Sequence, residues 1–231
     1  MAYNLSGVSN LKLSPATIAG IFSGKIKTWN DPAIKADNSG VSLPSTAITL
    51  AVRSDSSGTT QNFTQFLVDA TGSAWSLGSS STIKWPSAAR AGTGNPGVAQ
   101  IVKSTPGSIG YVDYATAKAS SLSFASVQNK TGAYIAPSPT SASAAADGST
   151  VATNLTFAAA WAPGASAYPI TYQSWDLVYA QQPSASDAAL LKAYLGYLLG
   201  DGQKLLSEIG LAPLPSSIDQ KAAAQLDKIT S

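Results

Sequence analysis

The residues best able to bind an anion share one short polar loop: Arg53, Asp55, Ser57, Gly58 and Thr59. Arg53 can donate a bidentate pair of hydrogen bonds to an oxyanion. Asp55 lies two residues further on and can hold that guanidinium in place. The hydroxyls of Ser57 and Thr59 are further donors, and Gly58 allows the backbone to come close to a ligand. The loop therefore has the chemistry to bind an oxyanion through several donors.

The elements on either side of this loop would present it at the start of a helix. Residues 48–52 form an apolar run that predicts a short buried strand. Phe63, Phe66 and Leu67 recur at helical spacing and predict a helix that reaches about residue 70. The first turn of a helix offers unpaired N–H groups and the positive end of the helix dipole. Both favour an anion at this position.

The same loop also fits an ordinary strand-to-helix connection. In that interpretation Ser57 or Thr59 is the N-cap, and Arg53 and Asp55 form a surface ion pair. The loop is not a P-loop, because no lysine follows the glycine as that motif requires. The residues of the loop alone leave both interpretations open.

A second glycine-rich loop, residues 92–97, precedes a helix predicted over residues 98–103. A phosphate cradle of the nucleotide type would need an apolar strand before the glycines, and the sequence has none there. We therefore expect this loop to serve as a cap or hinge. Residues 108–112 predict a strand with a close backbone approach at Gly110.

The composition excludes several classes of function. The net charge of +2 and the 11% of charged residues argue against a nucleic-acid surface. Without cysteine or histidine the chain has no disulfide, no thiolate metal site and no Ser-His-Asp triad. A phosphate-ester hydrolase using Arg53 and Ser57 would lack a general base. We expect a binding protein with no catalytic residues, no metal and no cofactor.

The remaining pattern predicts an α/β protein. Ser14 and Asp31, each followed by proline, predict two helix starts. Further short helices are expected at residues 113–119 and 141–146. Three more are expected near the end, at residues 185–200, 202–209 and 218–229. Two strands are expected at residues 168–172 and 175–179. The start of the chain lacks the basic region and apolar core of a signal peptide, and no apolar run is long enough for a membrane span.

An ordered set of motifs is more specific than any one of them. The set runs through Leu13-Ser14-Pro15, Ile21-Phe22-Ser23-Gly24-Lys25-Ile26, Trp29-Asn30-Asp31-Pro32, Arg53-Ser54-Asp55-Ser56-Ser57-Gly58-Thr59-Thr60, Gly94-Asn95-Pro96-Gly97-Val98-Ala99, Gly107-Ser108-Ile109-Gly110-Tyr111-Val112, Tyr168-Pro169-Ile170 and Leu214-Pro215. In this order the motifs resemble the PstS-like family, the substrate-binding proteins of bacterial phosphate ABC transporters. The resemblance covers nearly the whole chain.

The resemblance implies a type II periplasmic-binding-protein fold that closes on one phosphate. Arg53 would pair with phosphate oxygens, and Asp55 would support it. Ser57, Gly58 and Thr59 would donate hydroxyl and backbone N–H bonds. The implied partners are inorganic phosphate and the membrane permease of the importer. The implied location is the periplasm or the cell surface.

The chain departs from the family at its start, where an N-terminal segment of the family has no counterpart. Residues 1–165 would then form the second domain, and residues 166–231 the C-terminal part of the first. Half of the site would be absent, including an aspartate that accepts the proton of hydrogen phosphate. We would then expect weak binding without preference for phosphate over sulfate. The apolar faces that carry Trp175, Val178 and Leu191 would be partly exposed.

Three explanations of this departure stay open on the sequence. The chain could be a truncated form of the family protein that retains half of the site. A second chain could supply the segment. Alternatively, the chain could be a PstS-like surface or structural domain that has lost ligand binding.

Overall fold

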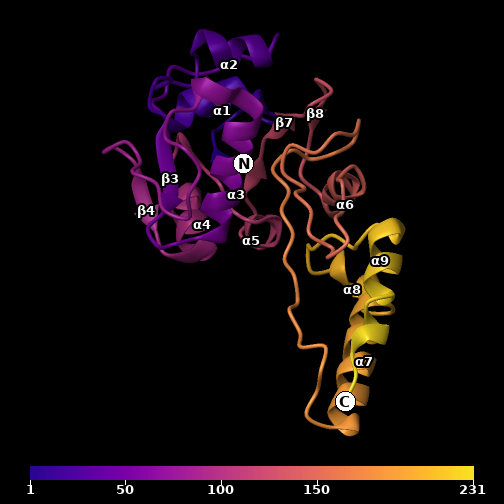
Figure 1. Ribbon diagram of the computed structural model, residues 1–231. Coiled ribbons are helices and arrows are strands. Elements are labelled where there is room, and N and C mark those ends of the chain that lie inside the picture. The colour runs from indigo at the N-terminus through magenta and orange to yellow at the C-terminus, as the bar shows by residue number, and fades with distance from the viewer.

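The computed structural model describes all residues from 1 to 231 and shows a mixed α/β protein, as predicted (Figure 1). The helices are α1 (Pro15–Phe22), α2 (Pro32–Asp37), α3 (Gly58–Thr71), α4 (Gly94–Ser104), α5 (Tyr114–Ala119), α6 (Pro139–Asp147), α7 (Ala185–Leu199), α8 (Gln203–Leu206) and α9 (Ser216–Ala223), with short 3-10 turns at Gly72–Ala74 and Leu226–Lys228. The strands are β1 (Ala2–Asn4), β2 (Lys12–Leu13), β3 (Thr49–Arg53), β4 (Arg90–Gly92), β5 (Ser108–Gly110), β6 (Ser123–Phe124), β7 (Ser126–Gln128) and β8 (Tyr134–Ile135).

Five of the strands form the central sheet in the order β4-β3-β5-β1-β6. Strand β3 runs parallel to both β4 and β5, and β1 runs antiparallel to β5 and β6. Parallel neighbours end at the same edge of a sheet, so the loops after β3 and β4 lie side by side. The other three strands form a small sheet in the order β2-β7-β8.

Helices cover both faces of the central sheet. Successive side chains of a strand point to opposite faces, and β3 shows this alternation. Leu50 and Val52 join the large core cluster, which includes apolar residues of α1 and α3, whereas Ala51 joins the smaller cluster with residues of α4 and α5. The sheet is therefore the middle layer, and β3 is held from both sides.

Local capping explains where the helices begin. Ser14 and Asp31 accept hydrogen bonds from the first turns of α1 and α2, and proline follows each cap, as predicted. Ser138 and Ser141 make a reciprocal capping box at α6. The strand and helix expected on either side of the Arg53 loop are also confirmed, as β3 and α3.

The predicted strands at residues 168–172 and 175–179 are wrong. A strand needs a neighbour to bond with, and no other strand of this chain pairs with either segment. Backbone groups of the first segment bond to a helix and a loop instead: the Tyr168 N–H donates to the Ser141 carbonyl in α6, and the Pro169 carbonyl accepts from the Trp161 N–H. The apolar residues that suggested strands are therefore not in a sheet.

Three helix boundaries also differ from the prediction. Helix α4 begins at Gly94 rather than residue 98, and α8 is a single turn. The helix expected over 218–229 instead begins at Ser216 and ends at Ala223, with Pro215 at its N-cap. The last residues leave the helix because Thr230 bonds to the backbone at Ala180 and Gln182.

The C-terminal region extends away from the sheet-containing body. Figure 1 shows the orange segment that follows residue 170 running in extended form to the far end of α7, with α9 lying beside α7. Trp175 and Val178 are exposed and Leu191 is half-buried, as expected. Leu177 is 93% exposed and Leu190 71%. None of the helices combines the length and the apolar character that a membrane crossing needs.

Candidate functional site

Arg53, the last residue of β3, is held rigidly. Its backbone N–H donates to the Tyr111 hydroxyl at 3.1 Å. Its side chain donates from Nε to Asp55 Oδ1 at 2.8 Å and from Nη2 to Asp55 Oδ2 at 2.5 Å. The Arg53 side chain is only 11% exposed. The Arg53–Asp55 pair anticipated from the sequence is present, and the guanidinium does not extend into solvent.

The neighbouring loop completes the support of Arg53. Nη1 of Arg53 donates to Asn95 Oδ1 at 3.2 Å, and the Gly94 N–H donates to Asp55 Oδ1 at 3.1 Å. Ser54 and Thr93 add a hydroxyl contact at 3.2 Å between the same two loops. Since arginine has five N–H donors, three are bonded within the protein and two remain free for a ligand.

Ser57 is the N-cap of α3. Its Oγ accepts from the N–H groups of Thr59 and Thr60 at 3.1 and 3.2 Å. Its own N–H donates to the Ser81 carbonyl at 3.0 Å, and the residue is buried. The capping interpretation of the loop therefore describes Ser57. What Ser57 still has to offer a ligand is its hydroxyl hydrogen.

Gly58 and Thr59 keep donors without partners in the protein. The Gly58 N–H and the Thr59 hydroxyl make no intramolecular hydrogen bond, whereas the Thr59 N–H is bonded to the cap. Gly58 is exposed and Thr59 half-buried. A side-chain carbon added at Gly58 would meet no protein atom within 4 Å. The fold itself therefore does not require a glycine at this position.

The electrostatics follow from these contacts. The hydrogen bonds from Arg53, and then the bond from the Gly94 N–H, hold the pKa of Asp55 well below its ordinary value. The hydrogen bond to Asp55 raises the pKa of Arg53, with smaller contributions from the charges of Asp55, Tyr111 and Tyr172 against the effect of burial. At neutral pH the loop therefore presents the positively charged guanidinium of Arg53. Its partner, the Asp55 carboxylate, accepts three hydrogen bonds within the protein.

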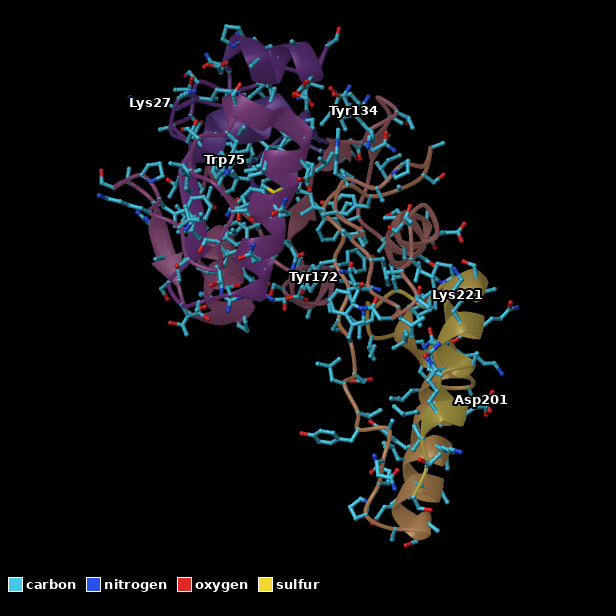
Figure 2. The ribbon with its side chains drawn as sticks, viewed as in Figure 1. Lys27, Trp75, Tyr134, Tyr172, Asp201 and Lys221 are labelled. Carbon is cyan, nitrogen blue, oxygen red and sulfur yellow. The ribbon has the colours of Figure 1, made fainter.

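An aromatic layer beneath the loop sets its position. The ring of Tyr111 stacks on Phe63 with centroids 4.7 Å apart and lies 5.7 Å from Trp85. Its hydroxyl also shares a 2.8 Å hydrogen bond with Thr60 Oγ1. Tyr111 thus joins β5 and α3 to the end of β3. Trp75 lies in the large core cluster and Trp85 packs against it, and Figure 2 shows Trp75 within the N-terminal body.

A cavity of about 550 Å³ lies beside the loop. Thr59 and Asn62 line one part of it, and Thr171 and Tyr172 line another. Arg53, Ser57 and Gly58 are not among its lining residues. Figure 2 shows Tyr172 where the N-terminal body meets the extended segment. Of the residues anticipated from the sequence, Thr59 therefore borders the cavity, and the others lie in the adjoining loop.

The sequence interpretation missed three residues of this region: Asn95, Tyr111 and Tyr172. Asn95 stood in the glycine loop between Gly94 and Pro96, where asparagine is a common turn residue. Tyr111 lies within the strand predicted over residues 108–112. Tyr172 stood in a predicted strand that does not form. None of the three carries a local signal, because each is brought to Arg53 by a different segment of the chain.

Comparison with known proteins shows the family. Residues 1–202 match a family model described as the PBP superfamily domain. The phosphate-binding protein PstS 2 of Mycobacterium tuberculosis is 34% identical over 243 residues, which cover 100% of this chain and 64% of that protein. The phosphate-binding protein PstS of Pasteurella multocida is 38% identical over 221 residues, which cover 93% of this chain and 63% of that protein. The chain thus spans less than two thirds of the length of these curated relatives.

Solved structures agree at the level of the fold. A high-affinity periplasmic phosphate-binding protein, solved with bound phosphate, superposes with a TM-score of 0.66 at 20% sequence identity. That match covers 97% of this chain and 68% of the solved chain. The periplasmic-binding-protein fold expected from the sequence is confirmed. The chain therefore belongs to the PBP superfamily, and its relatives by sequence are PstS phosphate-binding proteins.

Proposed function

We propose that this protein binds inorganic phosphate as the solute-binding component of an ABC phosphate importer. Its relatives are named phosphate-binding proteins, and they are longer than this chain. The site itself supports the proposal, since it presents a half-buried arginine held by hydrogen bonds, and unpaired donors at the start of a helix. These are features that stabilise a bound oxyanion.

The residues that we propose to bind phosphate are Arg53, Ser57, Gly58 and Thr59. Arg53 would donate from its two free N–H groups, Gly58 from its backbone N–H, and Ser57 and Thr59 from their hydroxyls. Asp55 would take no part in binding, because it is already bonded to Arg53 and Gly94. Each hydrogen bond to the charged ligand would contribute about 1.5–3 kcal/mol.

One observation carries the proposal. Three of the N–H groups of Arg53 are fixed by two loops, four residues before the N-cap of α3. A half-buried guanidinium held by three hydrogen bonds loses little conformational entropy when it binds an anion. An ordinary surface ion pair between Arg53 and Asp55 would not need the additional hydrogen bonds from the loop that carries Gly94 and Asn95.

Binding rather than catalysis fits the arrangement. The Ser57 oxygen accepts two amide hydrogen bonds and contacts no general base, so it has no route to become a nucleophile. We further propose that residues 1–165 form one domain and residues 166–231 part of another, with the membrane permease as partner. The periplasm or cell surface would then be the place of action.

Calorimetric titration with phosphate tests the proposal on the intact chain. We expect Arg53→Lys to weaken binding by about tenfold or more, because lysine keeps the charge but loses the planar donor pair. Arg90→Lys is the matched control, since Arg90 is exposed and bonds only to Thr105. Equal affinity of the wild type and Arg53→Lys would overturn the assignment of the site. No heat with phosphate or sulfate would favour a surface or structural domain that has lost its ligand.

A further inference from the structure

We propose that Asn95 is a positioning residue that fixes the orientation of the Arg53 guanidinium. The glycine loop of residues 92–97 in turn holds Asn95 in place. The functional meaning of this inference rests on the proposed phosphate site. The contact itself can be tested without any ligand. The loop was expected from the sequence to be a cap or hinge.

The two loops hold each other reciprocally. Arg53 reaches from the β3 loop to Asn95 Oδ1, while the Gly94 N–H reaches from the β4 loop back to Asp55 Oδ1. Asp55 thereby accepts hydrogen bonds both from Arg53 and from the first turn of α4. The Ser54 N–H also donates to the Gly92 carbonyl at 3.0 Å. The ends of the two parallel strands therefore form one hydrogen-bonded unit.

Asn95 prevents a rotation of the Arg53 guanidinium that Asp55 alone would allow. The Asp55 carboxylate grips one edge of the guanidinium, the edge formed by Nε and Nη2. A planar group held along one edge can still pivot about that edge. The bond from Nη1 to Asn95 holds the opposite corner and removes this freedom. The two N–H groups of Arg53 that have no partner in the protein are then held in a single orientation.

The glycines are what allow Asn95 to reach this position. A side-chain carbon on Gly92 would lie 2.5 Å from the carbonyl carbon of Gly97, which is closer than atoms can approach. Gly94 has φ of 65°, in the left-handed region that favours glycine. The backbone therefore curls tightly between β4 and α4. Asn95 in the first turn of α4 is brought within bonding distance of the end of β3.

The contact is tested by NMR of the arginine side chain in the ligand-free protein. In the wild type we expect resolved, slowly exchanging Nη protons for Arg53. Asn95→Ala should collapse these signals and speed their exchange, while Asn95→Asp, which keeps an acceptor, should retain them. Gln100→Ala on the exposed face of α4 is the matched control and should change nothing. Unchanged Arg53 signals in Asn95→Ala would overturn the proposal.

The consequence for binding is measured separately. We expect Asn95→Ala to weaken phosphate binding by about tenfold, the usual effect of losing one hydrogen bond to a charged group. Thermal unfolding without phosphate should stay close to the wild type, because Asn95 is only half-buried. Changed NMR signals with unchanged affinity would refute a role in binding. If the wild type does not bind phosphate, the proposed function fails, and the NMR result alone decides whether Asn95 positions Arg53.

Discussion

At the scale of single residues, Asp55 connects more of the site than any other side chain. It accepts two hydrogen bonds from Arg53 and one from the Gly94 N–H. These donors favour its charged form, which is why its pKa lies well below the ordinary value. The site therefore keeps its ion pair over the whole physiological range of pH.

The depressed pKa of Asp55 predicts how stability depends on pH. The unfolded carboxylate takes up a proton below about pH 4, before the folded one does, so its contribution is present above that pH and lost below it. The difference in unfolding free energy between the wild type and Asp55→Asn should be constant from pH 7 to about 5 and shrink toward pH 3. Urea unfolding across this range measures it. A difference that does not change with pH would contradict the assignment.

The donor set of the loop also predicts its selectivity. Arg53 and the Gly58 N–H offer donors only, the Thr59 hydroxyl can donate or accept weakly, and the one carboxylate of the loop already accepts from Arg53 and Gly94. Such a set has no free carboxylate to select the proton that distinguishes hydrogen phosphate from sulfate. We expect sulfate to compete with phosphate at this loop within about tenfold in affinity. Competition calorimetry near pH 8 checks this, and strong rejection of sulfate would show that another acceptor takes part.

At the scale of elements, the site depends on how closely the strands pack against α4. Gly110 of β5 faces Ala51 of β3 and Val98 of α4. A side-chain carbon at Gly110 would lie 2.9 Å from the Ala51 carbonyl oxygen and 3.0 Å from Val98 Cγ1. The close approach expected at Gly110 is confirmed. It brings the ends of β3 and β5 together, and with them Arg53 and Tyr111.

Gly110→Ala should therefore destabilise the protein by about 1–3 kcal/mol, the usual cost of overpacking a core. Gly196→Ala is a useful control, because this glycine lies inside α7 and a side-chain carbon there would meet only Leu226 Cδ1, at an ordinary contact distance of 3.9 Å. It should be neutral or stabilise by up to about 1 kcal/mol. Denaturant unfolding of both variants measures the contrast. Equal stabilities of the two variants would show that β5 can shift without cost.

Tyr134 connects the small sheet to the first helices. Its hydroxyl donates to Asp37 Oδ1 at 2.8 Å, and Asp37 Oδ2 accepts from the Ser14 N–H. Burial, and then the bond to Asp37, raise the pKa of Tyr134 to about 12. An unfolded tyrosine ionises near pH 10, so its contribution is present below about pH 10 and lost on the way to pH 12.

We therefore expect Tyr134→Phe to lose part of the decline in unfolding free energy between pH 10 and about 12. Tyr179→Phe is the control, because Tyr179 is 87% exposed. Its stability curve should follow the wild type. Identical curves for all three proteins would refute a role for the Tyr134–Asp37 bond.

At the scale of the whole molecule, the C-terminal region has an unpartnered apolar surface. Leu190, Tyr194 and Tyr197 recur at helical spacing on α7 and are each at least half exposed. Ala188 is the one buried residue of α7. Exposed apolar areas of this kind favour association.

The isolated chain should therefore bind hydrophobic dyes and self-associate as its concentration rises. Replacing Leu190 and Tyr194 by serine should reduce both effects, because it interrupts the apolar face of α7 without touching the sheet. Sedimentation velocity and dye fluorescence provide the measurement. A monodisperse monomer at high concentration would contradict the prediction.

What the sequence by itself determined was local. Caps, prolines and apolar spacing predicted the starts of α1, α2 and α3, because a helix start depends on residues within one turn. The Arg53 loop was found for the same reason, since its donors are neighbours in the chain. Only the tertiary structure decided that Asn95 and Gly94 complete this loop and that residues 168–179 form no strand. Both depend on which segments lie side by side, and that is set by the packing of the sheet between its helices rather than by any short stretch of residues.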